Sequence, residues 1–197
     1  MSHIYSSTID GVSGVPVEIE TALEQSLPQI HITGLPGPSV KESRDRVRAA
    51  LQSLGFEVPS QKTVIHLSPA EYKKQGSQFD LAIAIGVLLA ERKIQLPDGQ
   101  AIALLGELTL DGRIKKVQFA LPLTECFDSL ADVGIIIAPQ GNAPELGLIA
   151  SSRVRLASSL AEVVEYLRGT RDLPSPPPRT FGSPATASMT TFDRIIG

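Results

Sequence analysis

The chain has 197 residues, of which 42% are hydrophobic and 20% are charged, and 18 Lys and Arg against 21 Asp and Glu leave a net charge of −3. The length suits one domain of ordinary size, or one domain plus a linker. The composition excludes a wholly disordered chain and a free-standing polybasic nucleic-acid binder, although a local basic face remains possible. A single cysteine, Cys126, excludes a disulfide framework and a multi-cysteine zinc site.

The apolar pattern and the N-terminal residues bear on location. The longest apolar run covers residues 81–90, about half of the roughly 20 residues that a membrane span needs. The first residues, MSHIYSSTID, lack the charged and then apolar layout of a signal peptide. We therefore expect a soluble, cytoplasmic protein with no membrane partner.

The first part of the chain alternates strands with one helix. Period-2 alternation predicts strands over residues 3–9, 14–20 and 29–33. A helix follows, with Ser39 as its expected N-cap and Glu42 as the partner in a capping box. Apolar residues recur at helical spacing up to Leu54, and Gly55 is the expected stop.

The next elements lie around a strongly apolar segment. Residues 62–67 predict a strand, and the stretch from about Gln78 to Arg92 is apolar on all sides, which predicts a buried central helix. The Asp111-Gly112 pair predicts a hairpin turn between 101–108 and 113–117. The remaining pattern predicts a helix near 119–131, a strand over 134–138, a short helix near 144–150, a strand over 153–157 and a helix over 159–168.

Hairpins and helical crossovers both occur in this order, so residues 1–169 are predicted to form one α/β domain with a mixed, α+β-like sheet. From Thr170 the sequence becomes rich in proline, which predicts a semi-stiff extended linker over 170–190. Apolar residues return in 191–197, and we interpret them as the first residues of a further domain.

The glycine-rich stretch GLPGPSVKES, residues 34–43, invites comparison with a phosphate-binding loop. The required pattern places a lysine six residues after the first glycine, and Val40 stands at that position. Pro36 and Pro38 also lack the N–H groups that would hold a phosphate. The sequence therefore favours a structural helix start over a nucleotide site.

Basic residues provide the candidate binding surface. Lys41, Arg44 and Arg48 stand at i, i+3 and i+7, so they share one face of the expected helix. A row of three cations can hold a phosphate backbone, or it can be a solvated helix face, and both interpretations stay open from the residues alone. Further cations on segments expected to reach the surface are Lys73, Lys74, Arg113, Lys115 and Lys116.

Ser77 admits two interpretations. It can be a nucleophile with Lys73 or Lys74 as its base, or the N-cap of the buried helix with Asp80 as reciprocal partner, and the cap is favoured. Cys126 lies in an apolar helical pattern and is expected in the core. No metal site is predicted, because the histidines fall on separate strands without ligand spacing: His3, His31 and His66.

Three segments carry a family resemblance: ITGLPGPSVKESRDRVRAAL, KKQGSQFDLAIAIG and GELTLDGRIKKVQFAL. In this order they resemble the N-terminal domain of the magnesium-chelatase-subunit-like ATPases of the ComM (YifB) family, over about residues 4–168. The stub TTFDRIIG resembles the entry into that family's AAA+ ATPase module. The resemblance implies the fold of the Lon proteolytic domain, which is that of ribosomal protein S5 domain 2.

The Lon resemblance implies positions for a catalytic dyad. Lon-type peptidases carry a serine two positions after the glycine that opens the buried helix, and with Gly76 matched to that glycine the position holds Gln78. Counting from Gly112, the position of the catalytic lysine falls on Leu121. An amide and an alkyl chain cannot perform Ser–Lys acylation, so we expect a catalytically empty peptidase scaffold.

The resemblance also implies a function for the whole protein: a homohexameric ATPase that acts on DNA as a branch-migration helicase in recombination and natural transformation. ATP and Mg²⁺ would be bound by the downstream AAA+ domain, so no cofactor and no enzymatic activity are expected in this chain. We expect a domain for weak, non-specific DNA contact or for ring assembly. The alternatives are a residual Lon-type hydrolase that uses Ser77, and a chelatase-type chaperone module.

Overall fold

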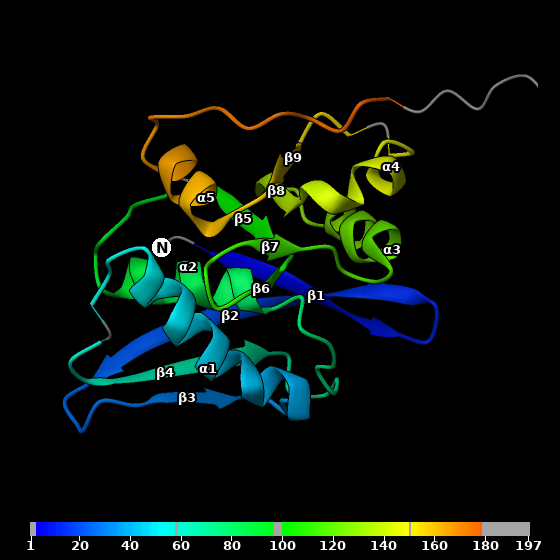
Figure 1. Ribbon diagram of the computed structural model, residues 1–197. Coiled ribbons are helices and arrows are strands. Elements are labelled where there is room, and N and C mark those ends of the chain that lie inside the picture. Colours follow the sequence, from blue (N-terminus) through cyan, green and yellow to red (C-terminus); the bar gives the residue numbers. More distant parts are fainter. Residues whose placement is uncertain (1–2, 58, 97–99, 150, 179–197) are drawn as a thin grey trace, which may run out of the picture.

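The computed structural model describes residues 3–57, 59–96, 100–149 and 151–178 (Figure 1). The strands of the main sheet are β1 (Ile4–Asp10), β2 (Ser13–Glu24), β3 (Ile30–Thr33), β4 (Lys62–Ser68), β5 (Ala101–Leu104), β8 (Val133–Pro139) and β9 (Val154–Ala157). A separate hairpin consists of β6 (Glu107–Leu108) and β7 (Ile114–Lys115). The helices are α1 (Pro38–Ser53), α2 (Asp80–Ala90), α3 (Ala120–Glu125), α4 (Ala143–Leu146) and α5 (Leu160–Leu167), with short 3₁₀ helices η1 (Cys126–Ser129) and η2 (Gln140–Asn142).

The sheet is mixed, as the sequence predicts. Within the described residues, seven strands pair in the order β3-β4-β2-β1-β5-β8-β9. The pairs β3–β4, β1–β5, β5–β8 and β8–β9 are parallel, whereas β1–β2 and β2–β4 are antiparallel. The α/β class is therefore confirmed.

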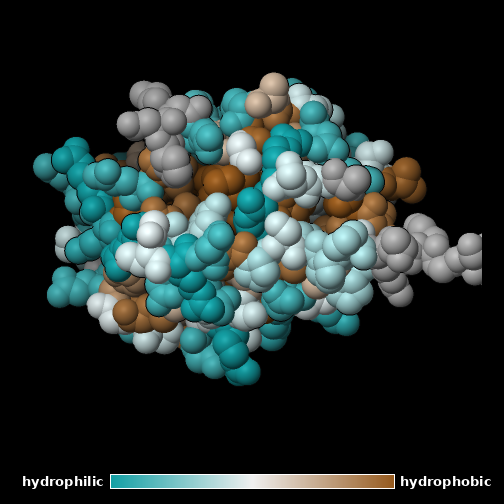
Figure 2. All heavy atoms as spheres, turned by 90° about the horizontal axis from the view of Figure 1, so that it is seen from above, coloured by the Kyte–Doolittle hydropathy of each residue, from teal (hydrophilic) through white to brown (hydrophobic). Residues whose placement is uncertain are grey.

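Helices cover both faces of this sheet. Along β5 the side chains alternate, so Ile102 and Leu104 join a core cluster with α1, α2 and α5. Ala101 and Ala103 join a second cluster with α3 and η1 on the other face. The predicted central helix is confirmed, since α2 is buried along residues 80–88. Hydrophilic residues dominate the face seen from above, and hydrophobic residues appear between them in smaller groups (Figure 2).

The starts of both long helices differ from the prediction. The N-cap of α1 is Gly37, and Ser39 lies inside the helix, where its hydroxyl accepts a hydrogen bond from the Gly76 N–H at 3.1 Å. The N-cap of α2 is Phe79 rather than Ser77, and no side chain caps either helix. Sequence spacing identifies candidate caps, but these hydroxyls are used by tertiary partners instead. The stop at Gly55 is confirmed by its φ of +77° just beyond α1.

The segment after α5 packs against the domain although it lies in the predicted linker. Arg171 pairs with Glu162 at 3.0 Å and with Glu165 at 3.2 Å, and Leu173 is only 4% exposed. The Leu156 N–H on β9 donates to the Pro174 carbonyl at 2.8 Å. The folded part therefore continues past residue 170. Residues 179–197, which include the rest of the predicted linker and the predicted start of a further domain, lie outside the described residues.

The Leu173 contact predicts a protease-resistant end. Trypsin is expected to spare the Arg171–Asp172 bond in the parent chain and to cut it at least tenfold faster in Leu173→Ala, because the truncated side chain no longer holds the segment in the core. Mass spectrometry of timed digests measures this. Ser175→Ala loses one exposed hydrogen bond, to Arg155 at 3.1 Å, and should keep the bond protected. Equal cleavage of parent and Leu173→Ala would contradict the packing of this segment.

No helix in the described ranges is long and apolar enough to cross a membrane.

Candidate functional site

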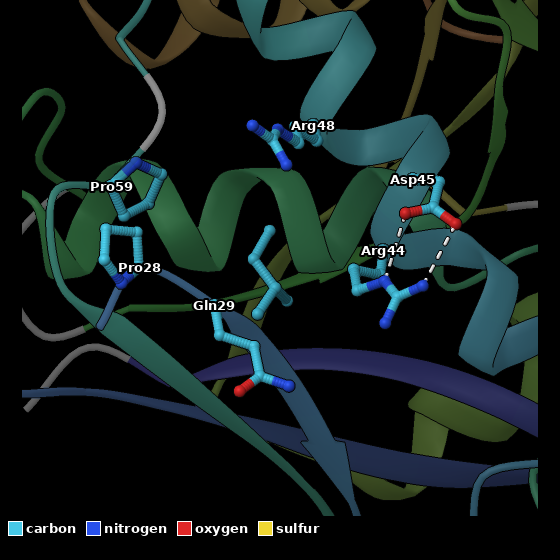
Figure 3. A pocket seen from close by; sticks show the side chains of 7 residues that line it. Pro28, Gln29, Arg44, Asp45, Arg48 and Pro59 are labelled. Atoms are coloured by element: carbon cyan, nitrogen blue, oxygen red, sulfur yellow. Dashed lines mark hydrogen bonds and ion pairs between the residues drawn. The ribbon is translucent and has the colours of Figure 1, made fainter. Parts of the chain in front are cut away.

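The α1 basic face, defined by Lys41, Arg44 and Arg48, is exposed. Arg44 and Arg48 lie on the side of α1 that looks toward the start of β3, where they border a groove of about 260 Å³ (Figure 3). The groove is lined by Pro28, Gln29, Ile30, Arg44, Asp45, Arg48 and Pro59. The helical spacing predicted from the sequence therefore places the three cations on one exposed face of α1, with Arg44 and Arg48 beside the groove.

One carboxylate partly compensates this row. Arg44 donates from Nε to Asp45 Oδ1 at 3.0 Å and from Nη2 to Oδ2 at 3.2 Å, as the dashed lines in Figure 3 mark. This hydrogen-bonded pair raises the pKa of Arg44 and lowers that of Asp45. Lys41 and Arg48 have no ion-pair partner in the part of the chain that the structure describes. The α1 basic face thus keeps an uncompensated positive charge.

The hairpin group, defined by Arg113, Lys115 and Lys116, is also exposed. Two of its members are paired, because Arg113 contacts Asp111 at 2.9 Å and Lys115 contacts Glu107 at 3.1 Å. Lys116 has no ion-pair partner among the described residues. The positive charge of this group is therefore weaker than its residue count suggests.

The two basic surfaces lie on opposite flanks of α1. At about 100° per residue, positions 41, 44 and 48 cluster on the flank next to β3, whereas Arg46 and Ser53 lie on the other flank. That second flank faces the hairpin: a Cβ on Gly112 would lie 3.4 Å from Ser53 Oγ. The structure therefore does not merge the sequence-predicted cations into one patch.

Lys73 and Lys74 differ in their exposure to solvent. Lys73 is exposed, but the side chain of Lys74 is fully buried and its Nζ donates to the Pro69 carbonyl. Burial lowers the pKa of Lys74. The Lys74 backbone is also fixed, since its carbonyl accepts from the Gly37 N–H at 2.8 Å. Lys74 was wrongly predicted to reach the surface and is removed from the candidate contacts, because a buried ammonium cannot meet a phosphate.

A buried ion pair was missed by the sequence reasoning. Asp80, fully buried at the start of α2, accepts from Arg46 Nε at 2.6 Å and Nη2 at 3.0 Å. It also accepts from the Ser43 hydroxyl and from the Leu108 N–H at 3.1 Å. Asp80 therefore joins α1, α2 and β6 instead of capping its own helix. Sequence offered no signal for this pairing, because the two residues are 34 positions apart.

The protonation of this pair follows from its setting. Burial raises the pKa of Asp80, and the hydrogen bonds from Arg46 and Ser43 oppose that rise. The hydrogen bond to Asp80 raises the pKa of Arg46. The Asp80 carboxylate accepts four hydrogen bonds, two of them from the Arg46 guanidinium. All of its acceptor positions are used within the fold, so the pair is a structural connection.

Ser77 has a carboxylate as its partner and no lysine. Its hydroxyl donates to Glu107, and Glu107 in turn accepts from Lys115 Nζ at 3.1 Å. Burial raises the pKa of Glu107, but the hydrogen bonds from Ser77 and Lys115 outweigh it, so the pKa lies below the usual value. Such a stabilised carboxylate is a weak base. Among the described residues, no hydrogen bond joins Ser77 to Lys73 or Lys74, so the structure does not pair the serine with the lysine base expected for a hydrolase.

The two positions matched to the Lon dyad perform structural roles. Gln78 is buried, and its amide donates to the Ser7 carbonyl at 3.1 Å and to the Gln75 carbonyl at 2.8 Å. Leu121 lies on α3, where its backbone N–H donates to Glu145 at 3.0 Å. Neither residue supplies a nucleophile or a base.

The glycine-rich turn before α1 does not fit a nucleotide phosphate. The Gly37 N–H is already engaged by Lys74, and a Cβ on Gly34 would lie 2.1 Å from the Leu67 carbonyl oxygen. The turn is therefore packed against β4, and the Gly37 N–H is used internally. Among the described residues, no group of three or more His, Cys, Asp or Glu is placed to hold a metal ion.

Comparison with known proteins identifies the family to which the chain is similar. Residues 19–142 match the family described as subunit ChlI of Mg-chelatase. The chain is 38% identical over 181 residues to the uncharacterised protein YifB of Salmonella typhimurium and 33% identical over 178 residues to YifB of Escherichia coli. It is 34% identical over 171 residues to the competence protein ComM of Haemophilus influenzae. These matches cover 91%, 90% and 87% of the chain but only 35%, 35% and 33% of the relatives, so the chain spans about a third of their length.

Proposed function

This chain belongs to the family of the ChlI subunit of Mg-chelatase, and from that premise we propose that it is the non-catalytic domain through which a longer AAA+ ATPase contacts DNA. The observation that carries the proposal is the α1 basic face, where Lys41 and Arg48 have no ion-pair partner among the described residues and Arg44 is held beside them. The likeness to a protein named for competence supports DNA as the partner.

The α1 basic face suits a phosphate backbone rather than base recognition. Three cations along one helix face follow a line, as successive phosphates do. Among the groove-lining residues, Asp45 carries the one exposed carboxylate and Gln29 the one exposed side-chain amide. Contacts of this kind are independent of sequence and depend on salt. One domain with a few such contacts is expected to bind in the ~10⁻⁴ to 10⁻⁶ M range of non-specific binding.

The longer protein would strengthen this weak contact. In the proposed hexamer, six copies of the domain present the same face to one DNA molecule, and avidity raises the overall affinity without new contacts. ATP and Mg²⁺ would be bound by the AAA+ domain that follows in the chain. The residues here would position the DNA, because the Gly37 N–H in the turn before α1 is already used by Lys74 and the partner of Ser77 is the weakly basic carboxylate of Glu107.

Charge reversal of the α1 basic face tests the proposal. Arg44→Glu/Arg48→Glu should lower affinity for a 20-base-pair duplex at least tenfold and make the plot of log affinity against log salt shallower by about 2, because each lost phosphate contact removes about one counterion. Fluorescence anisotropy from 50 to 200 mM salt measures both effects.

A matched control makes the result specific. Arg92→Glu/Lys93→Glu changes the net charge equally at exposed positions beyond the end of α2 and should affect binding much less. Lys74→Met should also leave duplex binding unchanged, because that side chain is buried. If the Arg44/Arg48 variant keeps its circular dichroism spectrum, its affinity and its salt slope, the DNA proposal fails and the domain is better explained as a scaffold for ring assembly.

A further inference from the structure

Phe119 combines an unusual backbone with an exposed ring. It precedes α3 with φ 59° and ψ 36°, in the left-handed region that bulky residues rarely occupy. Its side chain is 62% exposed, so packing does not offset the backbone strain. The backbone role of the residue is to accept from the Leu123 N–H at 3.1 Å, which any residue can do. Neither this hydrogen bond nor burial among the described residues therefore requires a phenyl ring here, and strain kept at a mostly exposed side chain points to function.

The ring is presented from a fixed backbone. Two residues earlier, the Asn142 side chain bonds both the N–H and the carbonyl of Val117 at 2.9 Å. Two residues later, Glu145 accepts from the Leu121 N–H at 3.0 Å. The backbone is thus held on both sides of Phe119. Binding of a partner to the exposed ring would therefore cost little backbone conformational entropy.

Two lysines precede Phe119 in the sequence. Lys116 and Lys115 are exposed three and four positions upstream, respectively, and Lys116 has no ion-pair partner within the described ranges. Of the Phe and Tyr residues that the structure describes, Phe119 alone is exposed; the others are buried or half-buried. The hairpin group therefore differs from the α1 basic face, whose groove is lined by no aromatic residue.

This combination favours single-stranded nucleic acid. In a duplex the faces of the bases are stacked on one another, whereas an unpaired base can stack on an aromatic side chain while a neighbouring cation holds its phosphate. We propose that Phe119 is a stacking platform for an unpaired base of single-stranded DNA, with Lys116 at the adjacent phosphate. This inference rests on the proposed function and gives the two basic surfaces different partners: duplex for the α1 basic face and single strand for the hairpin group.

Glycine at position 119 separates binding from folding. Phe119→Gly should lower affinity for a fluorescein-labelled 20-nucleotide thymidine strand by about tenfold or more, in keeping with the stacking contribution of one base. It should leave duplex affinity unchanged and raise the melting temperature, because glycine accepts the left-handed backbone without strain. Phe119→Trp should retain strand binding, and Leu110→Ala, which removes another exposed apolar side chain near the hairpin, should have no effect.

An abasic strand provides the sharpest control. With the bases removed, parent and Phe119→Gly should bind the sugar-phosphate chain equally, because no ring is left to stack. The inference is overturned if Phe119→Gly binds the thymidine strand as well as the parent does, if strand and duplex affinities fall together, if the melting temperature drops, or if light scattering shows that the variant loses a self-association that the parent has.

The outcome for the proposed function is read separately. If the Arg44/Arg48 variant loses duplex affinity while Phe119→Gly keeps strand affinity, the DNA-contact function holds and the stacking inference alone fails. If the parent chain binds neither the strand nor the duplex at millimolar concentration, both fail.

Discussion

Arg46→Ala is expected to lower the free energy of unfolding by about 3–5 kcal/mol, because it leaves the buried Asp80 carboxylate without its cation. Asp80 is fully buried and Arg46 is 21% exposed, so solvent cannot replace the two guanidinium hydrogen bonds. The variant also loses the connection between α1 and the start of α2. Urea denaturation followed by circular dichroism measures the loss.

The pH dependence identifies the cause. A carboxyl whose pKa is raised by folding destabilises the fold above that raised pKa and has no effect below its unfolded value. Without Arg46, the burial that already raises the pKa of Asp80 is less opposed. The deficit of the variant relative to the parent should therefore be largest near neutral pH and shrink as the pH falls toward the ordinary aspartate range, near 4.

Arg44→Ala is the matched control, because Arg44 also has an aspartate partner but the pair is exposed. Its removal should change stability little at any pH. Arg46→Ala/Asp80→Leu should recover part of the loss by removing the stranded charge together with its partner. A loss for Arg46→Ala no larger than that for Arg44→Ala would contradict the assignment of Arg46–Asp80 as a buried structural pair.

Gly34→Ala is expected to destabilise the domain by about 3 kcal/mol or more, since backbone strain and steric overlap add at this position. Gly34 has φ +87°, and an added Cβ would lie 2.1 Å from the Leu67 carbonyl oxygen. The nearest atoms, the O, C and N of Leu67, all belong to the backbone, so no side chain can move aside to relieve the overlap. The strain would act on the turn that places α1, and with it the α1 basic face, over the sheet.

Gly55→Ala separates the two contributions. Gly55 has a similar φ of +77°, but an added Cβ would meet nothing within 4 Å. Its substitution should cost only the left-handed backbone, about 1–2 kcal/mol. Thermal unfolding of the two variants measures the difference, and equal losses would show that the overlap with Leu67 is relieved by movement of the chain.

Local patterns in the sequence determined much of this protein. Alternation and helical spacing predicted the order of the strands and helices, except that the single strand predicted over 101–108 is two strands, β5 and β6, in different sheets. The uniformly apolar stretch around residues 81–90 identified the buried helix α2. Spacing also placed Lys41, Arg44 and Arg48 on one exposed face. These predictions succeed because they depend on the period of the backbone, which is a local property.

Tertiary structure alone decided which polar groups meet. The adjacent Lys73 and Lys74 look alike in sequence, yet one is exposed and the other is buried against the Pro69 carbonyl. Ser77 and Asp80 have the spacing of a cap, but their partners, Glu107 and Arg46, arrive from distant parts of the chain.

The same limit applies to the binding surfaces and to the end of the domain. The position of α1 between β3 and the hairpin separates two sets of cations that the sequence could only count together. The proline-rich composition after Thr170 indicated an extended segment, but the burial of Leu173 depends on the space left beside β9 and α5. Sequence periodicity determines which face of an element is apolar, whereas the partner of a buried charge or a packed loop depends on how the elements are assembled.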